Sequence, residues 1–285
     1  MRLRLFYRVS TGLVLGLRVF GANADAQTQP HDLATLGPAA SHALRLRSVQ
    51  WLSRKTEHAT IYVAAGSAAE PQLGSLERGV EAAISANLAW LHERPRQLRL
   101  RLFFVGSRND MAPLTGATHG GTSFTDEGTA FFVTNDSVRP ALKHEIMHLL
   151  SWRLWGTPRS MWMSEGVATA AVGPCRGYRL SALVAALDAA GRLLPLDSLR
   201  HDFVVAGEVG AVHYLEAASL VTFIDSTYGR QRLRNVWRRG LKTNDNRSGL
   251  DAAGLERVWR AEVKHQKPAK AWSAIWPEIR AHGCE

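Results

Sequence analysis

The sequence predicts an α+β fold in which strands occupy the amino-terminal part of the chain and helices the rest. Residues 59–64, 98–104 and 129–133 have the apolar runs or alternation typical of strands. From residue 164 onward, apolar residues recur at helical spacing and no further strand pattern appears. Segregation of strands from helices along a chain is characteristic of α+β domains.

The first strand, 59–64, ends at Gly66, and residues 73–93 have helical spacing with Pro95 just beyond their end. Within 98–104, leucines alternate with arginines, which predicts a half-buried strand. Pro140 is suited to the first turn of a helix that joins the two halves. Further helices are expected at 164–172, 178–190, 211–227, 230–239, 251–264 and 270–281, with a loop at 242–247.

The helix that follows Pro140 contains His144-Glu145-Ile146-Met147-His148. Residues four apart share one helix face, so His144 and His148 can direct their imidazoles at one point, and Glu145 borders that point. A catalytic zinc ion usually has three protein ligands, and Glu165 follows His148 in an apolar segment, with sixteen residues between them. A solvated helix face is the alternative, but the motif lies among apolar residues, where unpaired polar groups would cost about 1–3 kcal/mol each. We therefore expect one zinc ion per chain.

These residues resemble the gluzincin metallopeptidases, and among them the peptidase MA-like domains most closely. The pattern H-E-x-x-H followed by W-x-x-E-G-x-A is reproduced from His144 to His148 and from Trp162 to Ala168. The resemblance covers roughly residues 55–265. It implies a thermolysin-like zincin domain with a sheet-bearing amino-terminal lobe, a helical carboxy-terminal lobe and the cleft between them. It also implies that His144, His148 and Glu165 are zinc ligands and that Glu145 is the general base. The strand at 129–133 is the expected partner of an extended peptide substrate.

A second segment, Tyr214 to Gly229, is similar to one in the aminopeptidase branch of this group, including the fifteen-residue step from tyrosine to glycine. In that branch the tyrosine hydroxyl stabilises the oxyanion, and the role would pass to Tyr214. An ordinary helix-face tyrosine is the alternative, and His213 is the substitute candidate. The G-x-M-E-N stretch that binds a free amino terminus is missing, and Thr169 stands where thermolysin-like enzymes have Asp. Cleavage within a chain is therefore at least as plausible as aminopeptidase action.

The first residues have the pattern of an export signal. Arg2, Arg4 and Arg8 precede an apolar stretch from Val9 to Phe20, and small residues follow. Cleavage after Ala26 is expected, with Ala24 as the other option, and Arg18 leaves an uncleaved anchor open. About twelve apolar residues are too few to span a bilayer, where about 20 are needed. We expect a signal peptide at 1–26, a flexible segment at 27–50 and one metallopeptidase domain at 51–285, exported to the periplasm or the extracellular space.

The two cysteines, Cys175 and Cys284, are a candidate pair in an oxidising compartment, although the sequence leaves two unpaired thiols equally open. The formal net charge of +10 comes mainly from dispersed arginines without a nucleic-acid-binding motif. A solubilising surface is the favoured interpretation, and an anionic envelope surface or an acidic substrate are the alternatives. The expected partner is a peptide or protein substrate. A catalytically inactive module that binds a peptide or an envelope component is the competing hypothesis.

Overall fold

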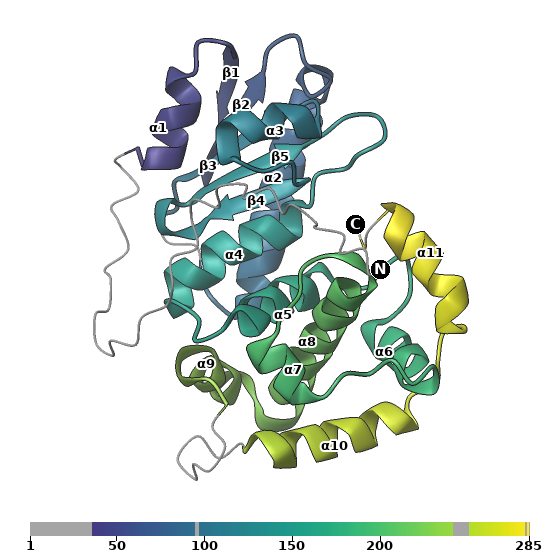
Figure 1. Ribbon diagram of the computed structural model, residues 1–285. Coiled ribbons are helices and arrows are strands. Elements are labelled where there is room, and N and C mark those ends of the chain that lie inside the picture. Colours follow the sequence, from purple (N-terminus) through teal and green to yellow (C-terminus); the bar gives the residue numbers. More distant parts are fainter. Residues whose placement is uncertain (1–35, 95–96, 242–250, 283, 285) are drawn as a thin grey trace, which may run out of the picture.

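The computed structural model describes residues 36–94, 97–241, 251–282 and 284. It is a mixed α+β structure built on one five-stranded sheet (Figure 1). The strands are β1 (Trp51–Lys55), β2 (Ala59–Ala64), β3 (Leu100–Val105), β4 (Gly121–Phe124) and β5 (Thr129–Val133). Their spatial order is β1-β2-β3-β5-β4, with β2, β3 and β5 parallel and the two outer strands antiparallel to their neighbours.

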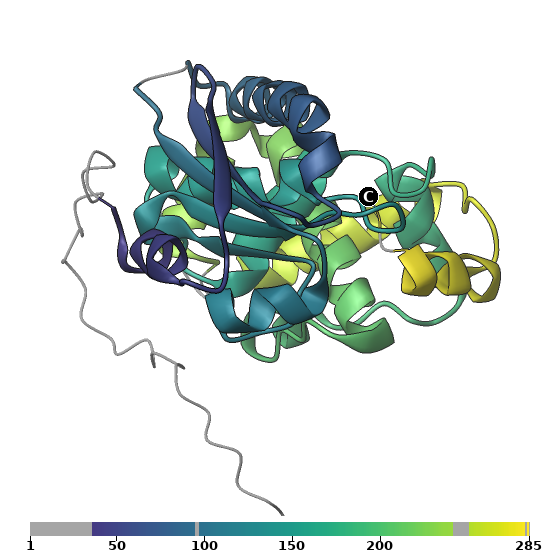
Figure 2. The same ribbon diagram turned by 90° about the horizontal axis from the view of Figure 1, so that it is seen from above.

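Helices cover both faces of the sheet and build the other lobe (Figures 1 and 2). In chain order they are α1 (Pro38–Arg45), α2 (Leu73–Leu91), α3 (Arg108–Thr115), α4 (Leu142–Trp155), α5 (Met161–Val172), α6 (Leu180–Ala189), α7 (Leu196–His201), α8 (Gly207–Tyr228), α9 (Arg230–Arg239), α10 (Ala252–His265) and α11 (Trp272–His282), with short 3₁₀ turns at Glu70–Gln72 and Thr125–Glu127. None of the helices in the described ranges is long and apolar enough to serve as a membrane span.

The side chains of the central strands alternate between two apolar cores. Leu102 and Phe104 of β3 pack into the large core that α2, α4 and the helical lobe share, whereas Phe103 and Val105 face a smaller core beneath α1 and α3. The predicted half-buried strand is therefore wrong in its burial: every residue of β3 is buried, and Arg101 is only 8% exposed. An alternation of apolar and polar residues normally indicates a strand with one face in solvent, but here helices cover both faces of the sheet.

Several boundaries differ from the expectations. The expected flexible segment 27–50 includes α1, whose Ala39, Ala40 and Ala43 are buried against the smaller core. Pro140 lies before α4 rather than inside its first turn, because the helix begins at Leu142. Four short elements were not predicted from the sequence: the strands β1 and β4 and the helices α3 and α7. The proposed export signal at 1–26 and the loop at 242–247 lie outside the described residues.

Candidate metal centre and its cleft

Helices α4 and α5 bring together the three residues that the sequence predicted as zinc ligands. His144 and His148 project from one face of α4, and Glu165 comes from α5, which packs against it. The two Nε2 atoms are 3.1 Å apart, and Glu165 Oε2 lies 3.2 Å from His144 Nε2 and 3.3 Å from His148 Nε2. The three ligand atoms thus form a nearly equilateral triangle. Tetrahedral zinc with bonds of about 2.0–2.1 Å separates its ligands by about 3.3 Å, so this donor set fits zinc.

His148 is buried, with 7% of its surface exposed, and its ring is fixed from behind by Ser164. The Ser164 hydroxyl lies 3.1 Å from His148 Nδ1 and also accepts a hydrogen bond from Trp152 Nε1 at 3.2 Å. An Nδ1–H that donates to Ser164 leaves Nε2 as the unprotonated nitrogen that binds a metal. Ser164 is therefore a supporting residue that sequence reasoning did not identify, although it immediately precedes Glu165.

The carboxylate of Glu165 is stabilised in its charged form by the two histidines. Burial would raise its pKa, but the charge and hydrogen bonds of His148 and His144 outweigh burial and hold the pKa of Glu165 well below its usual range. A carboxylate that stays ionised is the form in which glutamate binds a cation.

Glu145, the predicted base, lies beside this triangle against strand β4. Its carboxylate accepts a hydrogen bond from the Ser123 hydroxyl, which also contacts the backbone carbonyl of Glu145 at 3.1 Å. A Cβ atom at Gly121 would lie 2.6 Å from Glu145 Oε1, so the glycine leaves room for the carboxylate. Gly121 and Ser123 belong to β4, a strand that the sequence did not indicate, so their packing against Glu145 was not predicted.

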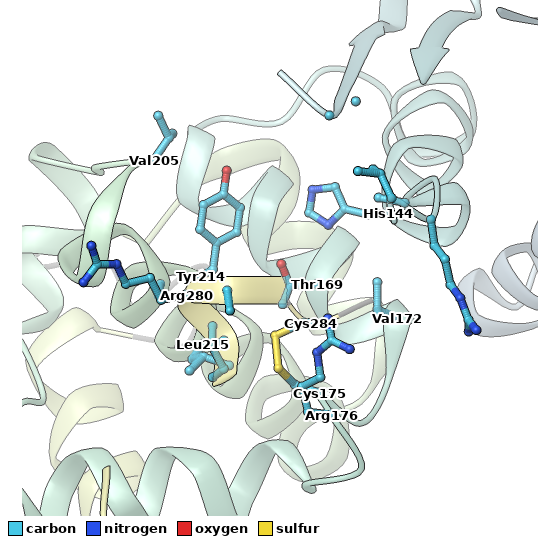
Figure 3. Close-up of a pocket in the computed structure, with 18 of the residues that line it drawn as sticks. His144, Thr169, Val172, Cys175, Arg176, Val205, Tyr214, Leu215, Arg280 and Cys284 are labelled. Atoms are coloured by element: carbon cyan, nitrogen blue, oxygen red, sulfur yellow. A yellow bond between two sulfur atoms is a disulfide. The ribbon is translucent and has the colours of Figure 1, made fainter. Parts of the chain in front are cut away.

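Tyr214 lies at the same site, on the first half of α8. Its ring lies near that of His144 (Figure 3), and the two ring centroids are 6.1 Å apart. The Tyr214 hydroxyl contacts Glu165. Burial, followed by the nearby charges of Glu165 and Glu145, raises the pKa of Tyr214, so the hydroxyl keeps its proton at neutral pH. Helix α8 approaches α5 closely because residue 166 is glycine: a Cβ there would lie 2.8 Å from the carbonyl oxygen of Ala217.

His213, the substitute candidate, makes its contacts with the segment that precedes α8. Its Nδ1 accepts a hydrogen bond from the Val204 backbone N–H at 2.8 Å, and its ring stacks on Phe203. Only 2% of the residue is exposed, and burial lowers the pKa of His213. The structure therefore brings Tyr214, and not His213, to the predicted site.

Strand β5 does not offer a free edge to an extended ligand. It pairs with β3 on one side and with β4 on the other, so the expectation that residues 129–133 bind substrate is wrong. The free edge nearest α4 belongs to β4, at the end of the sheet. The sequence did not indicate this because β4 has four residues and little strand character.

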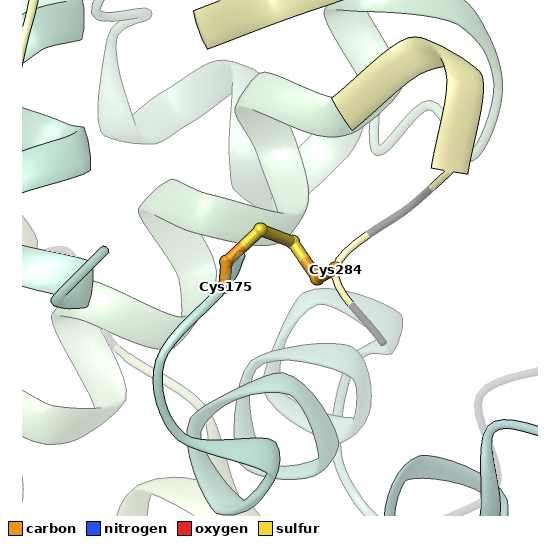
Figure 4. Close-up of a disulfide and its surroundings, with 2 residues drawn as sticks. All are labelled: Cys175 and Cys284. Atoms are coloured by element: carbon orange, nitrogen blue, oxygen red, sulfur yellow. A yellow bond between two sulfur atoms is a disulfide. The ribbon is translucent and has the colours of Figure 1, made fainter. Parts of the chain in front are cut away.

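A cleft of about 890 Å³ opens beside His144 and Tyr214, between the sheet-bearing part of the chain and the helical part. Thr169 lines it from α5, and Leu215 lines it from α8 (Figure 3). One wall includes the disulfide between Cys175 and Cys284, whose sulfur atoms are 2.03 Å apart (Figure 4). The structure pairs the two cysteines, which the sequence left open, and the bridge ties the segment after α11 to the loop that follows α5.

Comparison with known proteins finds no family model that matches the chain and no curated protein similar to it.

Proposed function

We propose that the chain is a zinc-dependent metallopeptidase of the gluzincin type, with a thermolysin-like catalytic domain, that acts on peptides or proteins after export. The observation that carries the proposal is the triangle of His144, His148 and Glu165, whose edges of 3.1–3.3 Å suit three ligands of tetrahedral zinc. The conjunction of this triangle with Glu145 and Tyr214 at the side of a large cleft favours catalysis over simple metal storage.

Zinc, when bound by these three residues, supplies a water of lowered pKa and polarises a carbonyl oxygen. Glu145 accepts the proton of the attacking water and passes it to the leaving amine. Ser123 orients the Glu145 carboxylate for this transfer. The protonated hydroxyl of Tyr214 donates a hydrogen bond to the oxyanion of the tetrahedral intermediate. An extended substrate can add to the free edge of β4, which runs beside α4.

Export is supported by the amino-terminal sequence pattern and by the disulfide bridge. The basic and apolar pattern of residues 1–26 fits a signal peptide, and the Cys175–Cys284 bridge is a bond that persists in oxidising compartments.

The experiment that tests the activity is incubation of the purified, zinc-loaded protein with a diverse peptide mixture, with cleavage positions read by mass spectrometry. New termini should accumulate with zinc-loaded protein and disappear after treatment with a chelator, and they should return when zinc is restored. Peptides that bind without being cut would instead identify an inactive binding module.

A further inference from the structure

Four arginines line the cleft, and they come from four segments far apart in the sequence. They are Arg108 at the start of α3, Arg139 just before α4, Arg176 in the loop after α5, and Arg280 on α11. All four are exposed. Asp136 is the single acidic residue among the described residues that line the cleft. The cleft wall therefore carries a strong excess of positive charge.

Two of these arginines have no ionic partner among the residues that the structure describes. Within the described ranges, neither Arg139 nor Arg280 forms an ion pair, and Arg108 donates a hydrogen bond to the Thr118 carbonyl at 3.2 Å. Some arginines outside the cleft are paired, such as Arg230 at 2.6 Å from Asp225 and Arg234 at 3.0 Å from Glu93. Unpaired cations around a concave surface create a positive potential that attracts anions.

Apolar residues and the charge of Arg280 together form surroundings that suit an acidic side chain of a substrate. In the view of Figure 3, Tyr214 lies between Arg280 and His144. Val205 lines the same cleft, as do Trp276 and Ile279 of α11, which provide an apolar wall next to the charge. The bridge from Cys284 to Cys175 tethers the end of this helix at the cleft. The planar guanidinium group pairs with carboxylates in a fixed geometry, so arginine is well suited to recognise them.

We propose that the cleft selects peptide segments that carry a carboxylate close to the bond at the metal centre, with Arg139 and Arg280 as the recognition residues. This inference rests on the proposed peptidase function and names its substrate class. The carboxylate can belong to an Asp or Glu side chain or to the carboxyl terminus of the substrate. The two sources share the same chemistry and differ in which peptides are cut.

The test uses the full-length, zinc-loaded protein and pairs of fluorogenic peptides that differ only by Glu or Gln at one position on either side of the scissile bond. Each peptide is made with a free and with an amidated carboxyl terminus. For exposed ion pairs, we expect kcat/KM to favour the Glu peptide by about tenfold at low salt and the preference to shrink as salt is added. Arg280→Gln and Arg139→Gln should each reduce the preference by about two- to fivefold. Arg239→Gln, an exposed change on α9 outside the cleft, is the matched control.

A preference that follows the internal Glu identifies side-chain recognition, and one that requires the free carboxyl terminus identifies terminal recognition. Equal kcat/KM for all four peptides would overturn the inference while leaving the peptidase function intact. The inference would also be overturned if Arg239→Gln lost the preference for Glu peptides as strongly as the cleft variants do.

Binding provides a readout that does not depend on cleavage. Fluorescence anisotropy with the Glu145→Gln variant should show tighter binding of the carboxylate-bearing peptides, and Arg280→Gln introduced into that variant should weaken it. Selective binding without turnover in the wild type would retain carboxylate recognition and reject the peptidase function. Equal affinity for all the peptides would reject carboxylate recognition.

Discussion

His144, His148 and Glu165 differ from a second group, Glu57, His58 and Glu81, in how their ligand atoms are arranged. Both groups bring histidine and carboxylate atoms within 4.8 Å of one another. In the first, two imidazoles contribute one nitrogen each to a single triangle. In the second, the two nitrogens of the His58 ring face different glutamates: Nδ1 lies 2.7 Å from Glu81, and Nε2 lies 3.8 Å from Glu57.

The second group has a structural role that accounts for its contacts. Glu81 of α2 accepts a hydrogen bond from the His58 backbone N–H at 3.0 Å as well as contacting its ring. These bonds tie the turn between β1 and β2 to α2. Burial would raise the pKa of Glu81, but hydrogen bonds from Thr56 and His58 outweigh burial and lower the pKa. The two groups therefore differ in geometry: the first directs three donor atoms at one point, whereas His58 uses different ring nitrogens toward Glu57 and Glu81.

The largest expected effect separates these two groups by metal content. His148→Ala should abolish stoichiometric zinc binding, because two ligands and water hold zinc far more weakly than three protein ligands. His58→Ala removes the same type of side chain and should leave one zinc per chain. Metal analysis after zinc loading and dialysis checks both variants. If His58→Ala loses zinc and His148→Ala keeps it, the zinc site is the second group and not the first. If the wild-type protein binds no zinc, neither group is a zinc site.

The next prediction sharpens the difference in chemical role. Glu145→Gln should retain zinc and fold but lose peptidase activity by several orders of magnitude, since the amide cannot accept the proton. Glu81→Gln makes the same change in the structural group and should affect stability but not kcat. Rates from the peptide assay and unfolding curves measure the two effects. Glu145→Gln activity within tenfold of wild type would show that another group is the base.

A smaller effect is expected at Tyr214. Tyr214→Phe should lower kcat by about 10²–10³ and leave zinc content and KM near the wild-type values, because the hydroxyl acts on the oxyanion and not on bound substrate. The phenyl ring preserves the packing against Phe203 and His144. Steady-state kinetics decide the matter. Normal turnover by the Tyr214→Phe variant would show that Tyr214 is an ordinary helix-face residue without a catalytic role.

The smallest effect concerns Glu216, a buried carboxylate that belongs to neither of these two groups. Burial raises the pKa of Glu216 to about 8, opposed by the Leu194 N–H and Arg260 and assisted by Glu256. Because the folded-state pKa lies above the ordinary 4.5, ionisation penalises folding increasingly as the pH rises from about 4.5 to about 8.

Glu216→Gln should therefore raise the free energy of unfolding at pH 8, by on the order of a few kcal/mol, and change it little at pH 5. Its amide oxygen can still accept the bond from Leu194. Urea unfolding at the two pH values measures this, with Glu278→Gln on the exposed surface of α11 as the control for lost charge. A stabilisation of equal size at both pH values would contradict the assignment.

The sequence by itself determined the elements with strong local patterns. The strands at 59–64 and 129–133 and the helix at 230–239 have the predicted bounds. It also predicted which residues meet at the metal centre, because His144 and His148 share a helix face and the spacing to Glu165 fits a return from the next helix. Packing around a cluster leaves no such local pattern, which is why Ser164 and Ser123 were not recognised.

Tertiary structure alone decided what surrounds that centre. The four cleft arginines are isolated in the sequence, and only the placement of α3, α4, α5 and α11 gathers them around one cleft. Likewise, only strand order revealed that β4, and not β5, has the free edge. Local periodicity reports which face of an element is apolar, but it carries no information on which distant segments will share a surface.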